Sequence, residues 1–281
     1  MKLIECPRDA MQGWHRLIST DEKVEYLNAL LKVGFDTLDF GSFVSPKAIP
    51  QMADTTDVIS RLDMDSAKSK LLAIVANQRG AEDAVVFDRI SYLGYPFSIS
   101  ETFQLRNTNK TISASMELVD TMQELCIKNS KQLVVYISMG FGNPYGDPYD
   151  ASIALQWVEE LVKRDITTIS LADTVGVANP EIITKLFSTL IPAYPEVEFG
   201  AHFHSAPHNW EEKVAAAYDQ GCRRFDSAIK GIGGCPMAKD ELVGNLATER
   251  LLDFSVQRHE QLGLDFVALQ TAQQIADRIF Y

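Results

Sequence analysis

Three side chains stand where their chemistry, more than their packing, explains their positions. Cys235 lies in the glycine-rich, strongly polar segment 231–245, and a loop of that composition is more often solvated than packed. His202 and His204 are separated by one residue, so in an extended strand both imidazoles project to the same side. We expect Cys235 to be a catalytic thiol and the two histidines to bind a metal ion. The simpler alternatives are a cysteine that only fills space and histidines that hydrogen-bond to loop carbonyls.

Asp9 and Asn245 would complete such a metal site. A carboxylate and an amide oxygen, together with two neutral imidazoles, form a mixed nitrogen and oxygen shell that leaves positions open for substrate or water. This shell suits Mg²⁺ or Mn²⁺ better than a closed structural zinc site. Asn245 also has a second interpretation, as the cap of a helix that begins with residues 246–249, and both roles can hold together.

Arg8 directly precedes Asp9. A positive charge beside a metal ligand is unfavourable unless an anionic substrate or transition state lies between them, and a developing enolate fits this requirement. The alternative is a structural ion pair of Arg8 with Asp39 or Asp173. We expect these two carboxylates to orient Arg8 or a metal-binding histidine.

A repeating pattern of strands and helices positions these residues. Short apolar runs alternate with longer stretches of helical apolar spacing, which indicates parallel strands linked by helices. The expected strands are residues 2–6, 37–43, 71–76, 89–95, 133–139, 168–172, 197–202 and 223–228. Helix boundaries are marked by a capping box at Ser19 and Glu22, by Asn179 before Pro180, and by Gly34 and Gly221 at helix ends.

Eight such units without a linker or a shift in composition favour a single (β/α)8 TIM barrel over residues 1–281. Barrel enzymes carry their chemistry at the carboxyl ends of the strands. Nearly all of the polar residues named above follow a strand and therefore fall on this rim. Asp39 is the exception, because it lies within the second expected strand.

Composition narrows the class of protein. The formal net charge of −12 argues against nucleic acid or anionic membranes as main partners. The apolar runs are too short to span a membrane, and the four cysteines show no zinc or disulfide spacing. We therefore expect a cytoplasmic protein.

The chain resembles the 3-hydroxy-3-methylglutaryl-CoA lyases, a family of metal-dependent barrels, over nearly its whole length. SFVSPK and GGCP are the more specific motifs, whereas Arg-Asp and His-x-His also occur in related synthases. The segments that carry the resemblance are ECPRDAMQ (5–12), SFVSPKAIPQMADT (42–55), LADTVGVANP (171–180), AHFH (201–204), GIGGCPMA (231–238) and GNLATE (244–249).

The resemblance implies a retro-Claisen cleavage of 3-hydroxy-3-methylglutaryl-CoA to acetoacetate and acetyl-CoA, and a homodimer is consistent with it. Arg8 would steady the enolate of the departing acetyl-CoA, and Gln12 would position the substrate. His202 or Asp9 would take part in proton transfer, and Cys235 would add acid and base chemistry. The ligands of the divalent ion would be Asp9, His202, His204 and Asn245.

Some positions depart from the pattern of the similar lyases. Asp39 stands where they usually carry glutamate, Gly13 where they carry asparagine, and Ser205 where an acidic residue follows the second histidine. These differences bear on the substrate more than on the reaction class. The alternatives are a Claisen-type synthase of the isopropylmalate-synthase group and a catalytically silent barrel that binds an acyl-CoA.

Overall fold

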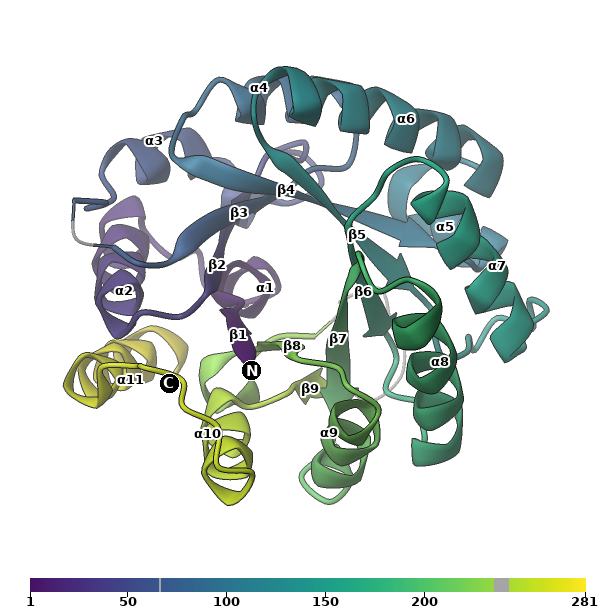
Figure 1. The fold of residues 1–281 in the computed structure, drawn as a ribbon. Coiled ribbons are helices and arrows are strands. Elements are labelled where there is room, and N and C mark those ends of the chain that lie inside the picture. The colour runs from purple at the N-terminus through teal and green to yellow at the C-terminus, as the bar shows by residue number, and fades with distance from the viewer. Residues whose placement is uncertain (66, 235–242) are drawn as a thin grey trace.

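A closed barrel of parallel strands forms the centre of the molecule (Figure 1). The computed structural model describes residues 1–65, 67–234 and 243–281. Within these ranges, eight strands pair in chain order and the pairing of the eighth with the first closes the ring. They are β1 (Lys2–Glu5), β2 (Thr37–Ser42), β3 (Lys70–Ile74), β4 (Ile90–Ser98), β5 (Gln132–Ser138), β6 (Thr168–Asp173), β7 (Glu198–Ser205) and β8 (Arg224–Ser227). The barrel predicted from the sequence is confirmed.

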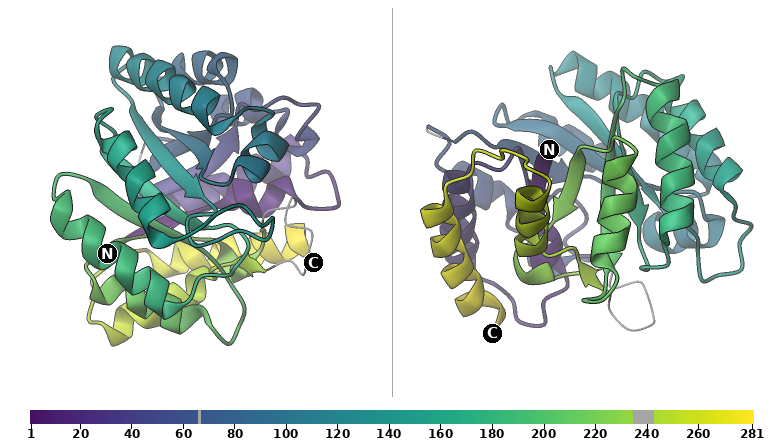
Figure 2. Two further views of the ribbon diagram at one scale, coloured as in Figure 1. Left: turned by 90° about the vertical axis from the view of Figure 1, so that its right-hand side faces the viewer. Right: turned by 60° about the horizontal axis from the view of Figure 1, so that its bottom comes forward.

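Helices surround the barrel, as the views in Figure 2 show. The last helix, α11 (Phe266–Phe280), packs beside α2 (Thr20–Val33), so the outer layer of helices closes on itself. The helices are α1 (Pro7–Gln12), α2 (Thr20–Val33), α3 (Thr55–Ser60), α4 (Gln78–Val85), α5 (Glu101–Thr108), α6 (Ile112–Lys128), α7 (Ala151–Val162), α8 (Pro180–Ala193), α9 (Trp210–Asp219), α10 (Thr248–Gln257) and α11 (Phe266–Phe280), with short 3₁₀ helices at Pro50–Met52 and Ile229–Gly231.

Helix boundaries follow the local signals in the sequence. Ser19 and Glu22 form the predicted capping box at the start of α2, and Gly34 ends that helix in the left-handed conformation with φ 86°. The side chain of Asn179 accepts a hydrogen bond from Ile182 N at the start of α8. These local predictions are confirmed, and they fix both ends of α2 and the start of α8.

The strands are buried on both faces. Every residue of β2, β6 and β8 is buried, because one face lines the barrel interior and the other packs under the helices. A single apolar cluster that includes Leu27, Phe187 and Phe225 joins the strands to the surrounding helices. Against such a background, a charged residue on a strand needs a specific partner.

The structure corrects two expected boundaries near the site. β7 continues to Ser205, so both histidines lie inside this strand and not at its end. Asn245 does not cap a helix, because α10 begins at Thr248 with Ala247 as its N-cap. Instead, Gly244–Asn245 forms β9, which pairs antiparallel with β7 and places Asn245 opposite His204. In the described ranges, no helix is both long enough and apolar enough to cross a membrane.

Candidate active site

A pocket of about 910 Å³ opens at the carboxyl ends of the barrel strands. Its walls come from segments that follow β1, β2, β3, β4 and β6 and from residues of the strands themselves. Asp39, which we expected to lie below the rim, reaches the same pocket. The residues from the sequence analysis that line it are Arg8, Asp9, Gln12, Asp39, His202 and His204.

Helix α1 gathers three of these side chains. Pro7 occupies its first turn, where the missing N–H of proline costs nothing. The side chains of Asp9 and Gln12, three residues apart, fall on one face of the helix. Gln12 Nε2 donates a hydrogen bond to Asp9 Oδ1 at 2.9 Å, and Arg8 Nη1 donates to the same oxygen at 2.9 Å. A six-residue helix therefore fixes one carboxylate between two donors.

Asp9, His202 and His204 form a group that can bind a metal ion. Each offers a ligand atom, and these atoms lie within 4.8 Å of one another. Burial raises the pKa of Asp9, but Arg8 and the two imidazoles outweigh it and leave this pKa below its usual value. An ionised carboxylate beside two imidazoles is a donor set that divalent cations accept.

His204 is prepared to act as a ligand. Its Nδ1–H donates to the carbonyl oxygen of Thr174 at 2.9 Å, which leaves the lone pair of Nε2 free. Burial lowers the pKa of His204 to about 4, so the ring is neutral at physiological pH. Within the described part of the chain, the buried Nε2 atom has no hydrogen-bond partner. A metal ion would satisfy this atom, so the group fits a cation.

His202 is held by Asp226, a residue that the sequence analysis missed. Asp226 Oδ2 lies 3.0 Å from His202 Nδ1, and this contact directs Nε2 away from Asp226. Burial lowers the pKa of His202, but the hydrogen bond and charge of Asp226 outweigh it and raise the pKa overall. Asp226 is 2% exposed and lies on β8. The sequence did contain a signal for Asp226, because a carboxylate within a strand predicted to be buried needs a specific partner.

Asn245 lies beside Asp9. Its amide nitrogen donates to Asp9 Oδ2 at 2.7 Å and to the carbonyl oxygen of Ile232 at 2.9 Å, which leaves the amide oxygen uncommitted by these two bonds. Gly233 packs closely against both residues, because an added Cβ would lie 2.6 Å from Asn245 Nδ2 and 2.9 Å from Asp9 O. With φ of 104°, this position also requires glycine. Cys235, the predicted catalytic thiol, lies outside the described residues.

Arg8 forms a close ion pair with Asp39. Arg8 Nη2 and Nε donate to Asp39 Oδ2 at 2.6 and 3.0 Å. Burial raises the pKa of Asp39 to about 6, and Arg8 opposes this shift. The structural ion pair considered from the sequence is therefore present. Because Arg8 also lines the pocket, the pair holds a guanidinium at the pocket wall next to Asp9.

Asp173 does not make the contact expected of it. Its carboxylate accepts a hydrogen bond from Lys213 Nζ on α9 at 2.7 Å. It therefore orients this lysine and not Arg8 or a histidine ring. Lys213 also donates to the carbonyl oxygens of Gly176 and His204 at 3.0 and 3.1 Å. This lysine was not singled out in the sequence, where it reads as a helix surface residue. In the structure it joins the segment after β6 to the end of β7.

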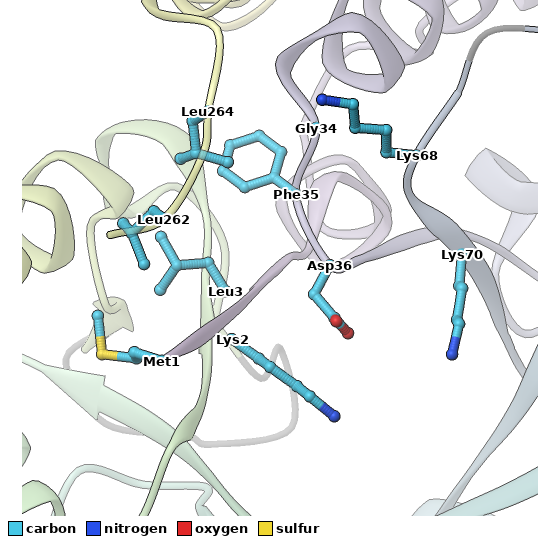
Figure 3. A pocket seen from close by; sticks show the side chains of 10 residues that line it. All are labelled: Met1, Lys2, Leu3, Gly34, Phe35, Asp36, Lys68, Lys70, Leu262 and Leu264. Carbon is cyan, nitrogen blue, oxygen red and sulfur yellow. The ribbon is translucent and has the colours of Figure 1, made fainter. Parts of the chain in front are cut away.

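A smaller pocket of about 260 Å³, whose lining side chains are drawn in Figure 3, lies at the amino ends of β1, β2 and β3 and therefore at the opposite end of the barrel. It is lined by Lys2, Asp36 and Lys70 together with apolar side chains such as Leu262. None of the residues predicted to do chemistry lines it. The larger pocket is therefore the candidate active site.

Comparison with known proteins places the chain in a family. Hydroxymethylglutaryl-CoA lyase YngG of Bacillus subtilis is 31% identical over 246 residues, which is 88% of this chain and 81% of that protein. A 3-hydroxy-3-isohexenylglutaryl-CoA/hydroxy-methylglutaryl-CoA lyase of Pseudomonas aeruginosa is 30% identical over 98% of this chain and 91% of its own length.

A solved structure of an HMG-CoA lyase from Acinetobacter baumannii, in complex with coenzyme A and 3-methylmalate, superposes with a TM-score of 0.91. The two share 30% sequence identity, and the match covers 100% of this chain and 91% of the other. The profile of the HMGL-like family matches residues 3–276. This chain therefore belongs to the HMGL-like family.

Proposed function

We propose that this protein cleaves 3-hydroxy-3-methylglutaryl-CoA, or a close 3-hydroxyacyl-CoA, to acetoacetate and acetyl-CoA. Membership in its family makes the chain a carbon–carbon lyase. The observation that carries the finer proposal is the group of Asp9, His202 and His204, whose ligand atoms converge beside Arg8 in the large pocket.

Asp9, His202 and His204 would hold a divalent ion, Mg²⁺ or Mn²⁺, and Asn245 would add its amide oxygen. Such an ion would supply Lewis-acid chemistry, which makes the hydroxyl of the substrate easier to deprotonate. Asp226 would keep the imidazole of His202 oriented, and the carbonyl of Thr174 would do the same for His204.

In the proposed cleavage, the tertiary hydroxyl loses its proton and its oxygen becomes the ketone of acetoacetate. The bond between the carbon that bears this oxygen and the carbon next to the thioester carbonyl breaks. Its electron pair goes to the enolate of acetyl-CoA. A proton then returns to this enolate carbon, so no external oxidant or reductant is needed. His202 or Asp9 would take part in the first proton transfer, and Cys235 in acid and base chemistry.

Arg8 would stabilise the developing enolate oxygen. Its guanidinium is fixed by Asp39, so little reorganisation is needed when negative charge forms. Gln12 donates to Asp9 and also lines the pocket, which would let it position the substrate. These roles use side chains that are already in place before substrate arrives.

Two positive side chains of the pocket support an acyl-CoA. Arg106 on α5 and Lys110, which follows this helix, both line the pocket. Phosphate oxygens would meet positive charge there. The solved structure of the Acinetobacter relative contains coenzyme A, which supports the same class of substrate. The homodimer and the cytoplasmic location expected from the sequence stay predictions.

The test is a substrate panel with products identified by mass spectrometry. Wild-type protein with Mn²⁺ should release acetoacetate and acetyl-CoA from 3-hydroxy-3-methylglutaryl-CoA. Arg8→Gln should lower kcat far more than it raises KM, because stabilisation of an enolate matters mainly in the transition state. If the protein cleaves only a different 3-hydroxyacyl-CoA, the proposed reaction type stands but 3-hydroxy-3-methylglutaryl-CoA is not its substrate. Condensation of acetyl-CoA with a 2-oxo acid, without cleavage, would favour the synthase alternative.

A further inference from the structure

A second group of potential metal ligands lies on the other side of His202. The ligand atoms of Cys6, His202 and Asp226 also lie within 4.8 Å of one another. Cys6 directly follows β1, and Asp226 lies on the adjacent strand β8, where it pairs with Ile4. We propose that these three side chains form an alternative site for a thiophilic divalent cation such as Zn²⁺ or Cd²⁺, which excludes the ion bound by Asp9, His202 and His204.

In the segments that the structure describes, Asp226 and Cys6 each have a ligand atom that is not held by a short hydrogen bond. Asp226 uses Oδ2 to hold His202, and its buried Oδ1 has no hydrogen-bond partner among the residues described. Cys6 is 1% exposed, and its thiol contact to the carbonyl oxygen of Ile4 is long, at 3.7 Å. A buried carboxylate oxygen without a partner is costly unless another group satisfies it. A cation next to the sulfur of Cys6 would do so.

The donor types select the class of ion. A thiolate, an imidazole and a carboxylate are ligands of zinc sites, whereas Mg²⁺ and Mn²⁺ prefer oxygen. With metal–ligand bonds of about 2.0 to 2.3 Å, donor atoms in a tetrahedral site lie roughly 3.3 to 3.8 Å apart. The present group, with atoms within 4.8 Å, needs side-chain shifts of about one ångström. Cys6 would lose its proton on binding.

Charge and geometry make the two sites exclusive. Around Cys6 and His202 lie three carboxylates, Asp9, Asp39 and Asp226, and one guanidinium, Arg8, which sums to −2 when both imidazoles are neutral. Arg224 also lies near Asp226, but it pairs with Glu198. One divalent ion at Asp9, His202 and His204 neutralises this charge, and a second ion at Cys6 would leave net positive charge in a buried region even after the thiol loses its proton. His202 belongs to both groups, and a neutral imidazole offers only one nitrogen lone pair, so an ion at either site removes a ligand from the other.

An ion can reach either group through the same opening. His202 and Asp226 both line the large pocket, and Cys6 lies behind them. A thiophilic ion that enters the pocket would therefore bind Cys6 and Asp226 and withdraw His202 from the catalytic arrangement. Inhibition of turnover by such an ion rests on the proposed function, whereas binding of the ion to Cys6, His202 and Asp226 does not.

The experiment uses Co²⁺ as the probe on metal-free protein. Binding at Cys6 should give the near-ultraviolet absorption band of a cobalt thiolate, and Mn²⁺ should diminish the band by competition. The band should be lost in Cys6→Ser and kept in Cys235→Ser. Cys222→Ser serves as the control for a buried thiol elsewhere in the barrel. A band that survives in Cys6→Ser, or that disappears in Cys235→Ser, overturns the proposal.

A second measurement does not depend on a variant that folds. X-ray absorption at the zinc edge of the wild-type protein should show one sulfur ligand, and a shell of nitrogen and oxygen alone contradicts the proposed site. Competition is then measured by Mn²⁺ release, followed by electron paramagnetic resonance. Cd²⁺ should displace Mn²⁺ from wild type at a concentration about tenfold lower than from Cys6→Ser. Equal displacement in both proteins refutes the shared site. All these readouts stay valid if no lyase activity is found.

Discussion

Replacing Lys213 by methionine would remove one partner of a buried ion pair and leave the other behind. The side chains of Lys213 and Asp173 are 1% and 0% exposed, and 2.7 Å separates Nζ from Oδ2. Removing one member of such a pair typically costs about 3 to 5 kcal/mol, because an uncompensated charge stays buried. Most domains have only about 5 to 15 kcal/mol of stability in total, so the expected loss is large.

The measurement is urea unfolding of metal-free protein, followed by circular dichroism. Lys213→Met should lose about 3 to 5 kcal/mol at alkaline pH and less as the pH falls, because burial raises the pKa of Asp173 and its carboxylate then takes up a proton instead. Adding Asp173→Asn should restore much of this loss, since no charge is then left unpaired. Lys163→Met is the matched control, because Lys163 is 56% exposed in its surface ion pairs and should change stability by about 1 kcal/mol at most.

The reasoning fails if Lys213→Met is within about 1 kcal/mol of wild type, or if the double variant is less stable than the single one. The first result would mean that water or another cation compensates Asp173. The second would mean that the Asp173 carboxylate stabilises the fold without Lys213, for example through the hydrogen bond that Oδ1 accepts from Ala178 N at 3.0 Å.

Three further predictions concern metal binding and pH. Asp226→Asn should weaken Mn²⁺ binding by about 10- to 100-fold in calorimetry, because His202 loses the carboxylate that orients it; unchanged affinity would contradict this role. Chelation should abolish turnover, with Mg²⁺ or Mn²⁺ restoring it, and full activity of metal-depleted protein would remove the metal site from the mechanism. Burial raises the pKa of Glu5 from 4.5 to about 8, so the folded state holds this proton more tightly than the unfolded state does. Stability relative to Glu5→Gln should therefore be greatest below about pH 4.5 and fall as pH rises through about 8, by roughly 3 to 5 kcal/mol in denaturation curves; parallel pH profiles would count against it.

Local patterns predicted the fold and the placement of several site residues. Strand and helix alternation indicated the barrel, and the capping signals at Ser19 and Asn179 hold in the structure. The spacing of His202 and His204 indicated that their rings would meet, and their centroids lie 5.2 Å apart. Each of these features depends on residues that are close together in the chain, so they could be predicted from the sequence alone.

Partners of the site residues could not be predicted in the same way. Asp226 meets His202 only because β7 and β8 are adjacent and in register. Lys213 reaches Asp173 from the inner face of α9, and nothing in the surrounding sequence identifies that pair. Asn245 looks like a helix cap until the short antiparallel strand β9 is seen. Each partnership depends on tertiary geometry between distant segments.

The hydrogen bond between Asn245 and Asp9 joins residues 236 positions apart. Contacts over such a span form slowly, because the chain loses the entropy of closing a long loop before the new contact can stabilise it. Asp9 and Asn245 can meet only after β1 and β8 have come together, which brings the two ends of the chain into one ring. The ligand group is therefore absent from any partly folded intermediate that lacks this closure. Metal binding during refolding would report completion of the whole barrel, and not of any one segment.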